Sequence, residues 1–172
     1  MNVGYTHIAE QMRTLKLQGM ASALESSLTS NQPSHISSEQ LLELLIQQEY
    51  DERKSRKIDR LKQQAKFRYT ASLDQVKPSS KRNIDANQLA ALSTCNWISK
   101  SENLLITGPT GVGKSYLASA FGHQACLNNY NVMYTNAQKL FYNLRLSKID
   151  GSHRRMIASI ARAELLIIDD FG

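Results

Sequence analysis

The sequence has few of the features that mark secreted, disulfide-bonded or membrane proteins. Its two cysteines, Cys95 and Cys126, stand in unrelated contexts, which excludes a disulfide framework or a cysteine metal cluster. Its four histidines lack the spacing of metal ligands. No stretch approaches the roughly 18 consecutive apolar residues of a membrane span, and no signal-peptide pattern opens the chain. We therefore expect a soluble, cytoplasmic protein without a membrane partner.

Positive charge is present in excess, and it is concentrated in one segment. The 172 residues carry a formal net charge of +6. Residues 53–68 hold eight basic side chains and one acidic one, Asp59, whereas the other thirteen basic residues face fourteen acidic ones. A local excess of this kind is typical of proteins that bind a polyanion.

The basic segment belongs to a long predicted helix. Ser37 and Gln40 are spaced as a capping box, which predicts a helix start. Residues 38–67 contain no proline or glycine, so one helix of about 30 residues and about 45 Å is expected. Five polar side chains then share one face, namely Arg53, Arg56, Lys57, Arg60 and Gln64.

Two interpretations of this basic face are open. Runs of charge usually face water, and Asp51, Glu52 and Asp59 are close enough in sequence to pair with it. A solvated surface normally mixes both signs of charge, however, and here one sign dominates. This favours contact with the phosphate backbone of a nucleic acid without reading of the bases. The candidate DNA-binding residues are Arg53, Lys54, Arg56, Lys57, Arg60 and Lys62.

The chain is expected to divide into three parts. An imperfect apolar face predicts a helix over residues 5–30, with Gly19 inside it as a weak point. Residues 31–34 predict a turn, so this helix and the long one form an N-terminal helical module over residues 1–69. Residues 70–84 are polar and contain Pro78, which predicts a linker. Residues 85–172 form the third part.

The third part contains a phosphate-binding loop. Residues 108–115 read Gly-Pro-Thr-Gly-Val-Gly-Lys-Ser and match the pattern G-x-x-x-x-G-K-[ST] at every fixed position. An apolar run at 104–107 predicts a buried strand before the loop, and a helix follows it, which makes a chance glycine-rich turn a poor explanation. The predicted ATP-binding residues are Gly108, Pro109, Thr110, Gly111, Val112, Gly113, Lys114, Ser115 and Tyr116.

A second motif supplies carboxylates. Residues 165–168 are apolar and are followed by Asp169 and Asp170. A buried strand that ends in an acid is the Walker B arrangement, although solvated acids after an ordinary strand would look the same. We expect Ser115 and Asp169 to hold Mg²⁺, Lys114 to reach the β- and γ-phosphates, and Asp170 to orient the attacking water.

The order of the predicted elements indicates the fold class. Asp85 predicts a helix cap, residues 131–135 predict a further strand, and helices are expected over 137–146 and 153–163. Strands that alternate with helices predict an α/β P-loop NTPase core of three layers around a parallel sheet. Asn136, Arg154 and Arg155 are placed to contact nucleotide, DNA or a neighbouring subunit, and a helix cap and a solvated face explain them equally well.

The chain resembles the IstB helper ATPases of bacterial insertion sequences. The similarity lies in residues 14–21 (Thr-Leu-Lys-Leu-Gln-Gly-Met-Ala), in Glu49-Tyr50 before the basic helix, and in the two Walker motifs with the Asp-Asp-Phe-Gly ending. The resemblance implies an AAA+ ATPase that assembles as a homo-oligomer on duplex DNA and activates a partner transposase. The related DnaC-type helicase loaders share the nucleotide domain, which leaves a loader acting through protein contacts as the alternative.

The chain departs from this family because it stops at the Walker B motif. Members continue with a strand that carries a polar sensor and with an arginine finger, and the sensor strand lies between the two Walker strands. Without it the two Walker strands would lack their shared neighbour. We therefore expect a fragment that binds ATP weakly and hydrolyses it poorly, since loss of an arginine finger costs about 10³–10⁵ in rate.

Overall fold

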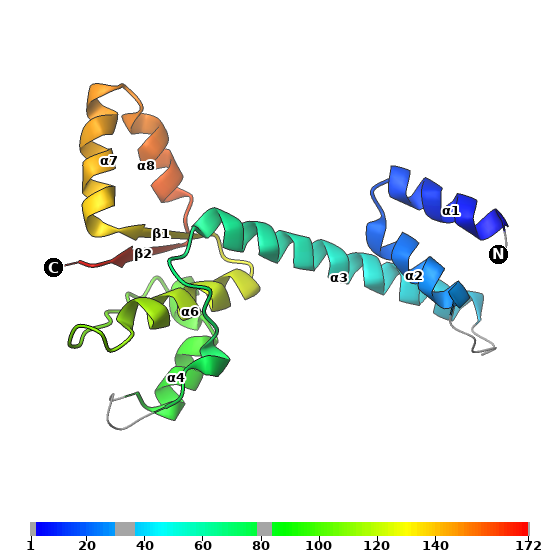
Figure 1. Ribbon diagram of the computed structural model, residues 1–172, viewed down its shortest axis with the longest axis horizontal. Coiled ribbons are helices and arrows are strands. Elements are labelled where there is room, and N and C mark those ends of the chain that lie inside the picture. Colours follow the sequence, from blue (N-terminus) through cyan, green and yellow to red (C-terminus); the bar gives the residue numbers. More distant parts are fainter. Residues whose placement is uncertain (1–2, 30–36, 79–83, 172) are drawn as a thin grey trace. The chain divides into compact units, whose positions relative to one another are not determined.

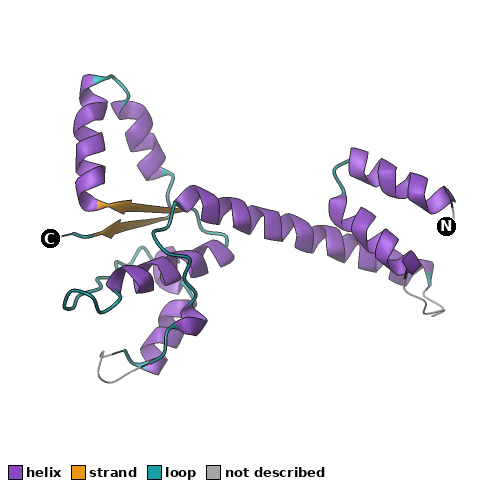
Figure 2. Ribbon diagram, viewed as in Figure 1, coloured by secondary structure: helices purple, strands orange, loops and turns teal. Residues whose placement is uncertain are grey.

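The computed structural model describes residues 3–29, 37–78 and 84–171. The expected turn at residues 31–34 and part of the expected linker lie outside them. No helix in the described ranges combines the length and the apolar character needed to cross a membrane. The elements, shown in Figures 1 and 2, are α1 (Val3–Thr14), α2 (Gln18–Thr29), α3 (Ser38–Ala65), η1 (Leu73–Gln75), α4 (Ala86–Ser93), α5 (Asn96–Ser99), α6 (Lys114–Leu127), β1 (Val132–Asn136), α7 (Ala137–Ile149), α8 (His153–Ala161) and β2 (Leu165–Asp169).

The chain divides into two compact units, and the boundary lies between Lys57 and Ile58. The first unit holds α1, α2 and the beginning of α3, and the second holds the end of α3 and everything after it. This boundary lies inside the long helix, whereas the sequence predicted a boundary at residue 69. The last turns of α3 belong to the second unit because Leu61 and Ala65 are buried in its core.

The expected single helix over residues 5–30 is wrong, because α1 and α2 are separate helices. Lys16 has a φ of 62°, its N–H donates to the Arg13 carbonyl at 2.9 Å, and the Leu17 N–H donates to the Met12 carbonyl at 2.8 Å. These bonds form a Schellman motif, which ends a helix. The residue at the left-handed position is usually glycine, and here it is lysine, so the sequence carries no obvious stop signal.

The helices of the first unit pack around a small apolar core. Ala9 from α1, Ala21 and Leu24 from α2, and Leu45 from α3 are buried together. Gly19, near the start of α2, lies against the backbone of α3: a Cβ there would stand 2.4 Å from the Gln48 carbonyl oxygen. The glycine therefore permits the close approach of two helices.

The predicted start of α3 is confirmed. The Ser37 N–H donates to Gln40 Oε1 at 3.0 Å, and the Gln40 N–H donates to Ser37 Oγ at 3.2 Å. This reciprocal pair is the capping box that the sequence spacing predicted. The helix then continues without interruption for 28 residues, to Ala65.

The second unit is built on a small parallel sheet. β1 pairs with β2 in parallel, and the register places Asn136 opposite Asp169. The helix α6 packs on both strands, while α7 and α8 lie side by side (Figure 1). β2 is half-buried along its whole length, whereas a buried strand was expected, because the sheet in the described ranges has only these two strands.

The strand expected at residues 104–107 does not form. This segment has no ladder partner among the described residues, and the Leu105 side chain is 84% exposed. An extended segment becomes a strand only when a neighbour accepts and donates its backbone hydrogen bonds. Leu104 nevertheless packs against the main core, the cluster of buried residues that includes Trp97 and Val132.

The expected linker is partly structured. Residues 73–75 form the short helix η1, whose start is capped by Ser72. Ala71 and Val76 are buried with Ala120 of α6 in a separate apolar cluster. The described part of residues 70–84 is therefore packed on α6. The side chains of Ala71 and Val76 anchor this otherwise polar segment. After it, the Asp85 carboxylate accepts from the Gln88 N–H at 2.9 Å, which confirms the predicted cap of α4.

Candidate nucleotide-binding site

The glycines of the phosphate-binding loop give it a backbone conformation that other residues rarely adopt. Gly111 and Gly113 have φ values of 84° and 94°, a region that glycine enters without steric cost. A Cβ at either position would meet no atom within 4 Å. Glycine is therefore required here for the backbone conformation, and the space beside the loop stays open to a phosphate chain.

The loop runs directly into α6. Gly113 is the residue before the helix, in the left-handed conformation, and its carbonyl accepts from the Leu117 N–H at 2.9 Å. Lys114 Nζ donates to the carbonyl oxygens of Gly108 and Pro109 at 2.9 and 2.8 Å. The lysine charge is thus held over the loop, and the first N–H groups of α6 add the positive end of a helix dipole.

Asp169 is the centre of a hydrogen-bonded cluster that joins the two Walker motifs. Ser115 Oγ donates to Asp169 Oδ1 at 2.8 Å, and the Tyr134 hydroxyl donates to Asp169 Oδ2. The packing of α6 on the sheet explains this meeting, because it brings the start of α6 to the carboxyl end of β2. A hydroxyl and a carboxylate oxygen in contact are suited to Mg²⁺, which prefers oxygen ligands.

These contacts affect the ionisation of the cluster. Burial acts to raise the pKa of Asp169, but hydrogen bonds from Tyr134 and Ser115 outweigh it and hold the pKa below its usual value. Burial and the hydrogen bond to Asp169 both raise the pKa of Tyr134. Asp169 is therefore an anion and Tyr134 a neutral donor at neutral pH.

Asp170 is exposed and lies beside Asn136 and Arg68. Asn136 Nδ2 donates to Asp170 Oδ2 at 2.8 Å, and the Asn136 Oδ1 accepts from the Gln138 N–H at 2.9 Å at the start of α7. Asn136 therefore serves both as the helix cap and as a partner of the second carboxylate. Asp170 has a φ of 52°, a left-handed conformation that aspartate tolerates better than most residues.

Sequence reasoning missed two residues of this cluster. Arg68 Nη1 lies 3.4 Å from Asp169 Oδ2 and 3.3 Å from Asp170 Oδ2. Tyr134 lies two residues before the end of β1, on the face of the sheet that Asp169 shares, so strand alternation was a signal for it. Arg68 carried no signal beyond its charge. Tyr116, a predicted nucleotide contact, is half-buried and its hydroxyl bonds Gln75.

The candidate DNA-binding residues fall into two groups. Arg53 Nε lies 2.6 Å from Glu49 Oε1, and Arg56 Nε lies 3.2 Å from Glu52 Oε1. Within the described ranges, the other four candidates form no ion pair. Of these, Lys54, Lys57 and Arg60 are exposed and Lys62 is half-buried. Intrahelical pairing therefore accounts for part of the basic face and leaves the rest unneutralised.

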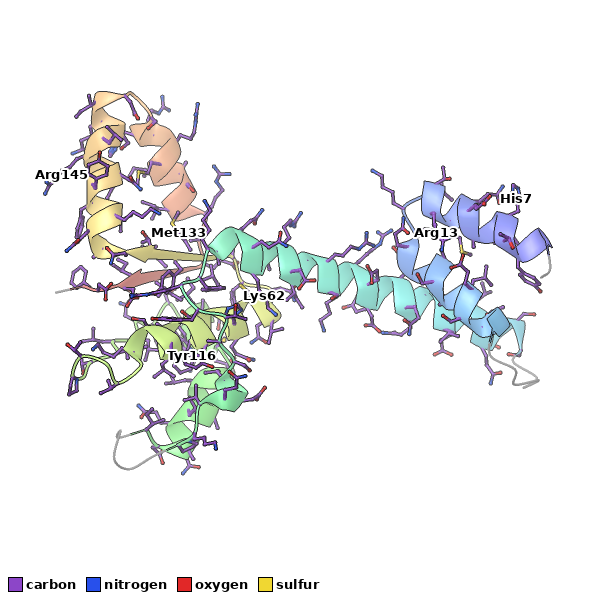
Figure 3. All side chains as sticks on the ribbon, viewed as in Figure 1. His7, Arg13, Lys62, Tyr116, Met133 and Arg145 are labelled. Atoms are coloured by element: carbon purple, nitrogen blue, oxygen red, sulfur yellow. The ribbon has the colours of Figure 1, made fainter. Side chains whose placement is uncertain are left out.

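A second excess of basic residues lies in and next to α7 and α8. Residues 137–163 hold six basic side chains and one acidic one, Asp150. Arg154 and Arg155 are exposed at the start of α8, and Arg145 projects from α7 on the side away from α8 (Figure 3). Exposed apolar side chains, including Tyr142 at 65% and Ile149 at 84%, lie on the same helix hairpin. The charge excess of the chain is therefore not confined to α3 once local acids are counted.

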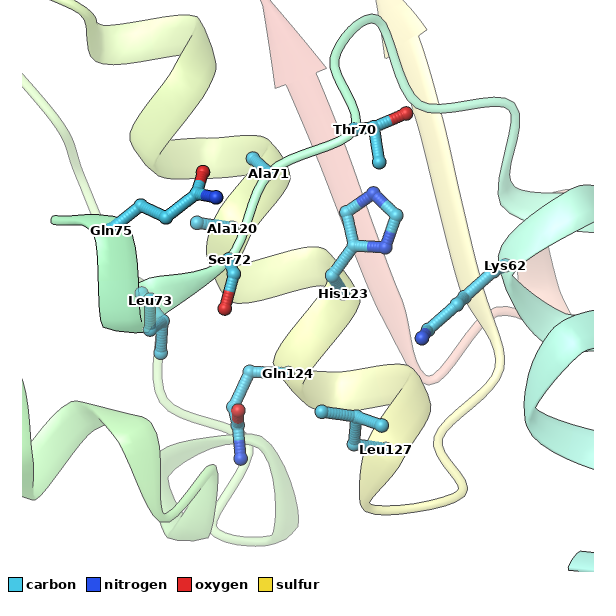
Figure 4. A pocket seen from close by; sticks show the side chains of 10 residues that line it. All are labelled: Lys62, Thr70, Ala71, Ser72, Leu73, Gln75, Ala120, His123, Gln124 and Leu127. Atoms are coloured by element: carbon cyan, nitrogen blue, oxygen red, sulfur yellow. The ribbon is translucent and has the colours of Figure 1, made fainter. Parts of the chain in front are cut away.

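A pocket of about 280 Å³ lies along the later part of α6 (Figure 4). Lys62, Thr70, Gln75 and His123 are among the residues that line it, and no residue of the phosphate-binding loop does. It is therefore separate from the loop at the start of the same helix.

A glycine loop that opens a helix, with its serine bonded to a carboxylate at the end of a parallel strand, defines a P-loop ATP-binding domain. Comparison with known proteins identifies the family within this class. The family described as IstB-like ATP binding protein matches residues 10–172. The chain therefore belongs to the IstB-like ATP-binding proteins.

Individual relatives agree with this family. The chain is 38% identical to an IS1162 protein of Pseudomonas fluorescens, over 96% of this chain and 72% of the relative. It is 36% identical to the y4pL protein of Sinorhizobium fredii, over 95% and 66%. It is 30% identical to an IS21-like protein of Bacteroides fragilis, over 95% and 82%. Their names assign each as an ATP-binding protein of an insertion sequence, and the chain spans about two thirds to four fifths of their lengths.

Proposed function

We propose that this protein is a transposition helper that binds ATP and Mg²⁺ at the P-loop and binds duplex DNA in that state. The observation that carries the proposal is the contact of Ser115 Oγ with Asp169 Oδ1 at 2.8 Å. It unites the two motifs in one site with the donor atoms that Mg²⁺ needs. The names of the relatives, all ATP-binding proteins of insertion sequences, support the transposition role.

Each residue of the site has a proposed task. The backbone N–H groups of residue 108 and residues 110–116 bind the phosphates, and Lys114 exchanges its bonds to the loop carbonyls for the β- and γ-phosphates. Ser115 and Asp169 hold Mg²⁺, which supplies charge neutralisation for the phosphates. Asp170 orients the attacking water, and its bond from Asn136 Nδ2 at 2.8 Å supports a fixed orientation of this carboxylate.

The proposed DNA contacts lie on the basic residues of α3. Lys54, Lys57, Arg60 and Lys62 have no acidic partner within the described ranges, so their charge is available to phosphates. Arg53 and Arg56 are shared with Glu49 and Glu52 and contribute less. We assign residues 1–69 as the DNA-binding module, residues 70–84 as the connection and residues 85–172 as the ATPase domain.

The remaining parts of the proposal follow from the family. We propose a homo-oligomer that assembles on DNA, activates a partner transposase, and acts in the cytoplasm, where bacterial ATP and DNA are found. We propose that the ATPase domain has the three-layer AAA+ architecture, for which the parallel β1–β2 pair with α6 against it is the supporting observation.

The test is DNA binding with and without nucleotide. Fluorescence anisotropy of a labelled random-sequence duplex should show tighter binding in ATP–Mg²⁺ than without nucleotide. The Lys114→Ala variant should bind DNA equally in both conditions, because its P-loop lacks the phosphate-binding charge. DNA binding that is absent even at low salt would contradict the proposal and favour a loader that acts through protein contacts.

A further inference from the structure

Arg68 bridges the two carboxylates that the proposed function assigns to Mg²⁺ and water. Its Nη1 lies 3.4 Å from Asp169 Oδ2 and 3.3 Å from Asp170 Oδ2. The Asp169 side chain is 11% exposed, whereas Arg68 is 50% exposed. The positive partner of the nearly buried Asp169 is thus Arg68, which lies outside the ATPase motifs, three residues after the end of α3.

Packing holds Arg68 in this position. α3 ends at the buried Ala65, and Lys66 turns the chain with a φ of 57°. The centroid of the Phe67 ring lies 4.3 Å from that of the His123 ring. It lies 6.1 Å from the centroid of the Tyr134 ring, in an edge-to-face arrangement. A Cβ at Gly122 would stand 2.3 Å from Phe67 Cε1, so the ring rests directly on the backbone of α6. The residue that follows Phe67 is thereby directed to the end of β2.

Arg68 and Mg²⁺ would draw on the same carboxylate. Asp169 Oδ1 is bonded to Ser115, and Asp169 Oδ2 is shared between Tyr134 and Arg68. A divalent ion held by Ser115 and Asp169 would supply the positive charge that Arg68 otherwise provides and would repel the guanidinium. Without the ion, Arg68 is the only basic side chain within the described ranges that pairs with either acid.

We propose that Arg68 is an internal counter-ion of the Walker B carboxylates and that binding of Mg²⁺–ATP displaces it. The displacement of Arg68 would signal to the end of α3 that nucleotide is bound. This inference rests on the proposed function, since it requires Mg²⁺ at Asp169. It links the ATP site to the basic helix through a single side chain. Phe67 is the hinge point, because it is seated on α6 immediately before Arg68.

The first test measures the affinity of a fluorescent ATP analogue in EDTA and across a Mg²⁺ titration. In Arg68→Gln, the Mg²⁺ concentration for half-maximal binding should fall about two- to fivefold, the range of a half-exposed ion pair. Its affinity in EDTA should weaken by a similar factor, because both acids then repel the phosphates. Arg68→Lys should resemble the wild type, and so should Lys66→Gln, an exposed residue of the same turn that removes the same charge.

The second test measures amide hydrogen exchange over residues 62–70. Addition of Mg²⁺–ATP should increase exchange there in the wild type and have little effect in Arg68→Gln, where the contact is already absent. Equal nucleotide affinity of wild type and Arg68→Gln, both in EDTA and in Mg²⁺, would overturn this inference but leave the proposed function intact. A uniform loss of affinity in Arg68→Gln, with or without Mg²⁺, would also overturn it. A wild type that binds no nucleotide would overturn the proposed function as well.

Discussion

Glu49 is a buried carboxylate that ties the beginning of α2 to the middle of α3. It accepts hydrogen bonds from the Gly19 and Met20 N–H groups at 2.8 and 3.3 Å, and from Arg53 Nε at 2.6 Å. The two N-terminal segments that carry the family resemblance therefore meet at one side chain. Their shared pattern has a structural cause, because the acid, the glycine and the arginine depend on one another.

Removing this carboxylate should destabilise the protein in a pH-dependent way. Burial acts to raise the pKa of Glu49, but hydrogen bonds from Arg53, Met20 and Gly19 outweigh it and hold the pKa below the usual value of a glutamate. Its stabilisation is therefore complete at neutral pH and is lost as the pH falls below that value. Glu49→Gln should lower the free energy of unfolding by about 2 kcal/mol at pH 7.

Urea denaturation at pH 7 and pH 3 checks this prediction, with Glu43→Gln as the control because Glu43 is exposed on the same helix. The difference between Glu49→Gln and the wild type should shrink at pH 3. A difference that is the same at both pH values would contradict the ionic role of Glu49.

Gly19 should not tolerate a side chain. A Cβ there would lie 2.4 Å from the Gln48 carbonyl oxygen and 2.6 Å from Glu49 Cα, which are backbone atoms that cannot move aside alone. Gly19→Ala should therefore cost about 1–3 kcal/mol, measured by urea denaturation. Gly4→Ala is the matched control, because nothing lies within 4 Å of its Cβ position in α1. Its effect should be neutral or stabilising by up to about 1 kcal/mol, and equal losses at both sites would refute the packing argument.

At the scale of elements, local signals predicted some features and missed others. The capping box at Ser37 and the Asp85 cap were predictable because each is satisfied by bonds within four residues. The break after Thr14 was not, because lysine occupies the left-handed position of the Schellman motif. The strand at 104–107 was predicted from its apolar side chains, but a strand forms only beside a partner, and no described residue pairs with this segment.

The basic side chains of α3 should differ in their effect on stability. Arg53→Gln leaves the buried Glu49 without its closest charged partner, so it should cost about 1 kcal/mol. Arg60→Gln should change stability by less than about 0.5 kcal/mol, because Arg60 is exposed and forms no ion pair within the described ranges. Chemical denaturation of both variants measures the difference, and a similar loss in each would show that the two groups of residues are not distinct.

At the scale of the whole molecule, the candidate site was predictable in its main parts. Ser115 and Asp169 were assigned to one site because the carboxyl ends of parallel strands meet the starts of the following helices. Arg68 was not predictable, since its position depends on how Phe67 rests on Gly122 of α6. A contact set by tertiary packing leaves no local pattern in the residues that make it.

Positive charge along α3 is the basis of the proposed DNA contact, and the salt dependence of DNA affinity measures that contact. Each phosphate contact adds about 0.9 to the slope of log affinity against log salt concentration. Lys57 and Arg60 are suitable for substitution because they are exposed and form no ion pair within the described ranges. Arg53 is unsuitable, since its loss would also disturb Glu49.

The most direct test is the anisotropy of a random-sequence duplex across a salt series with ATP–Mg²⁺ present, for wild type and Lys57→Gln/Arg60→Gln. The double variant should bind more weakly, with a salt slope shallower by about 1 to 2. The control is Lys16→Gln/Lys100→Gln, which removes two exposed lysines outside α3 and should keep the wild-type slope. An identical slope in wild type and the α3 variant would contradict the assignment of this helix to DNA.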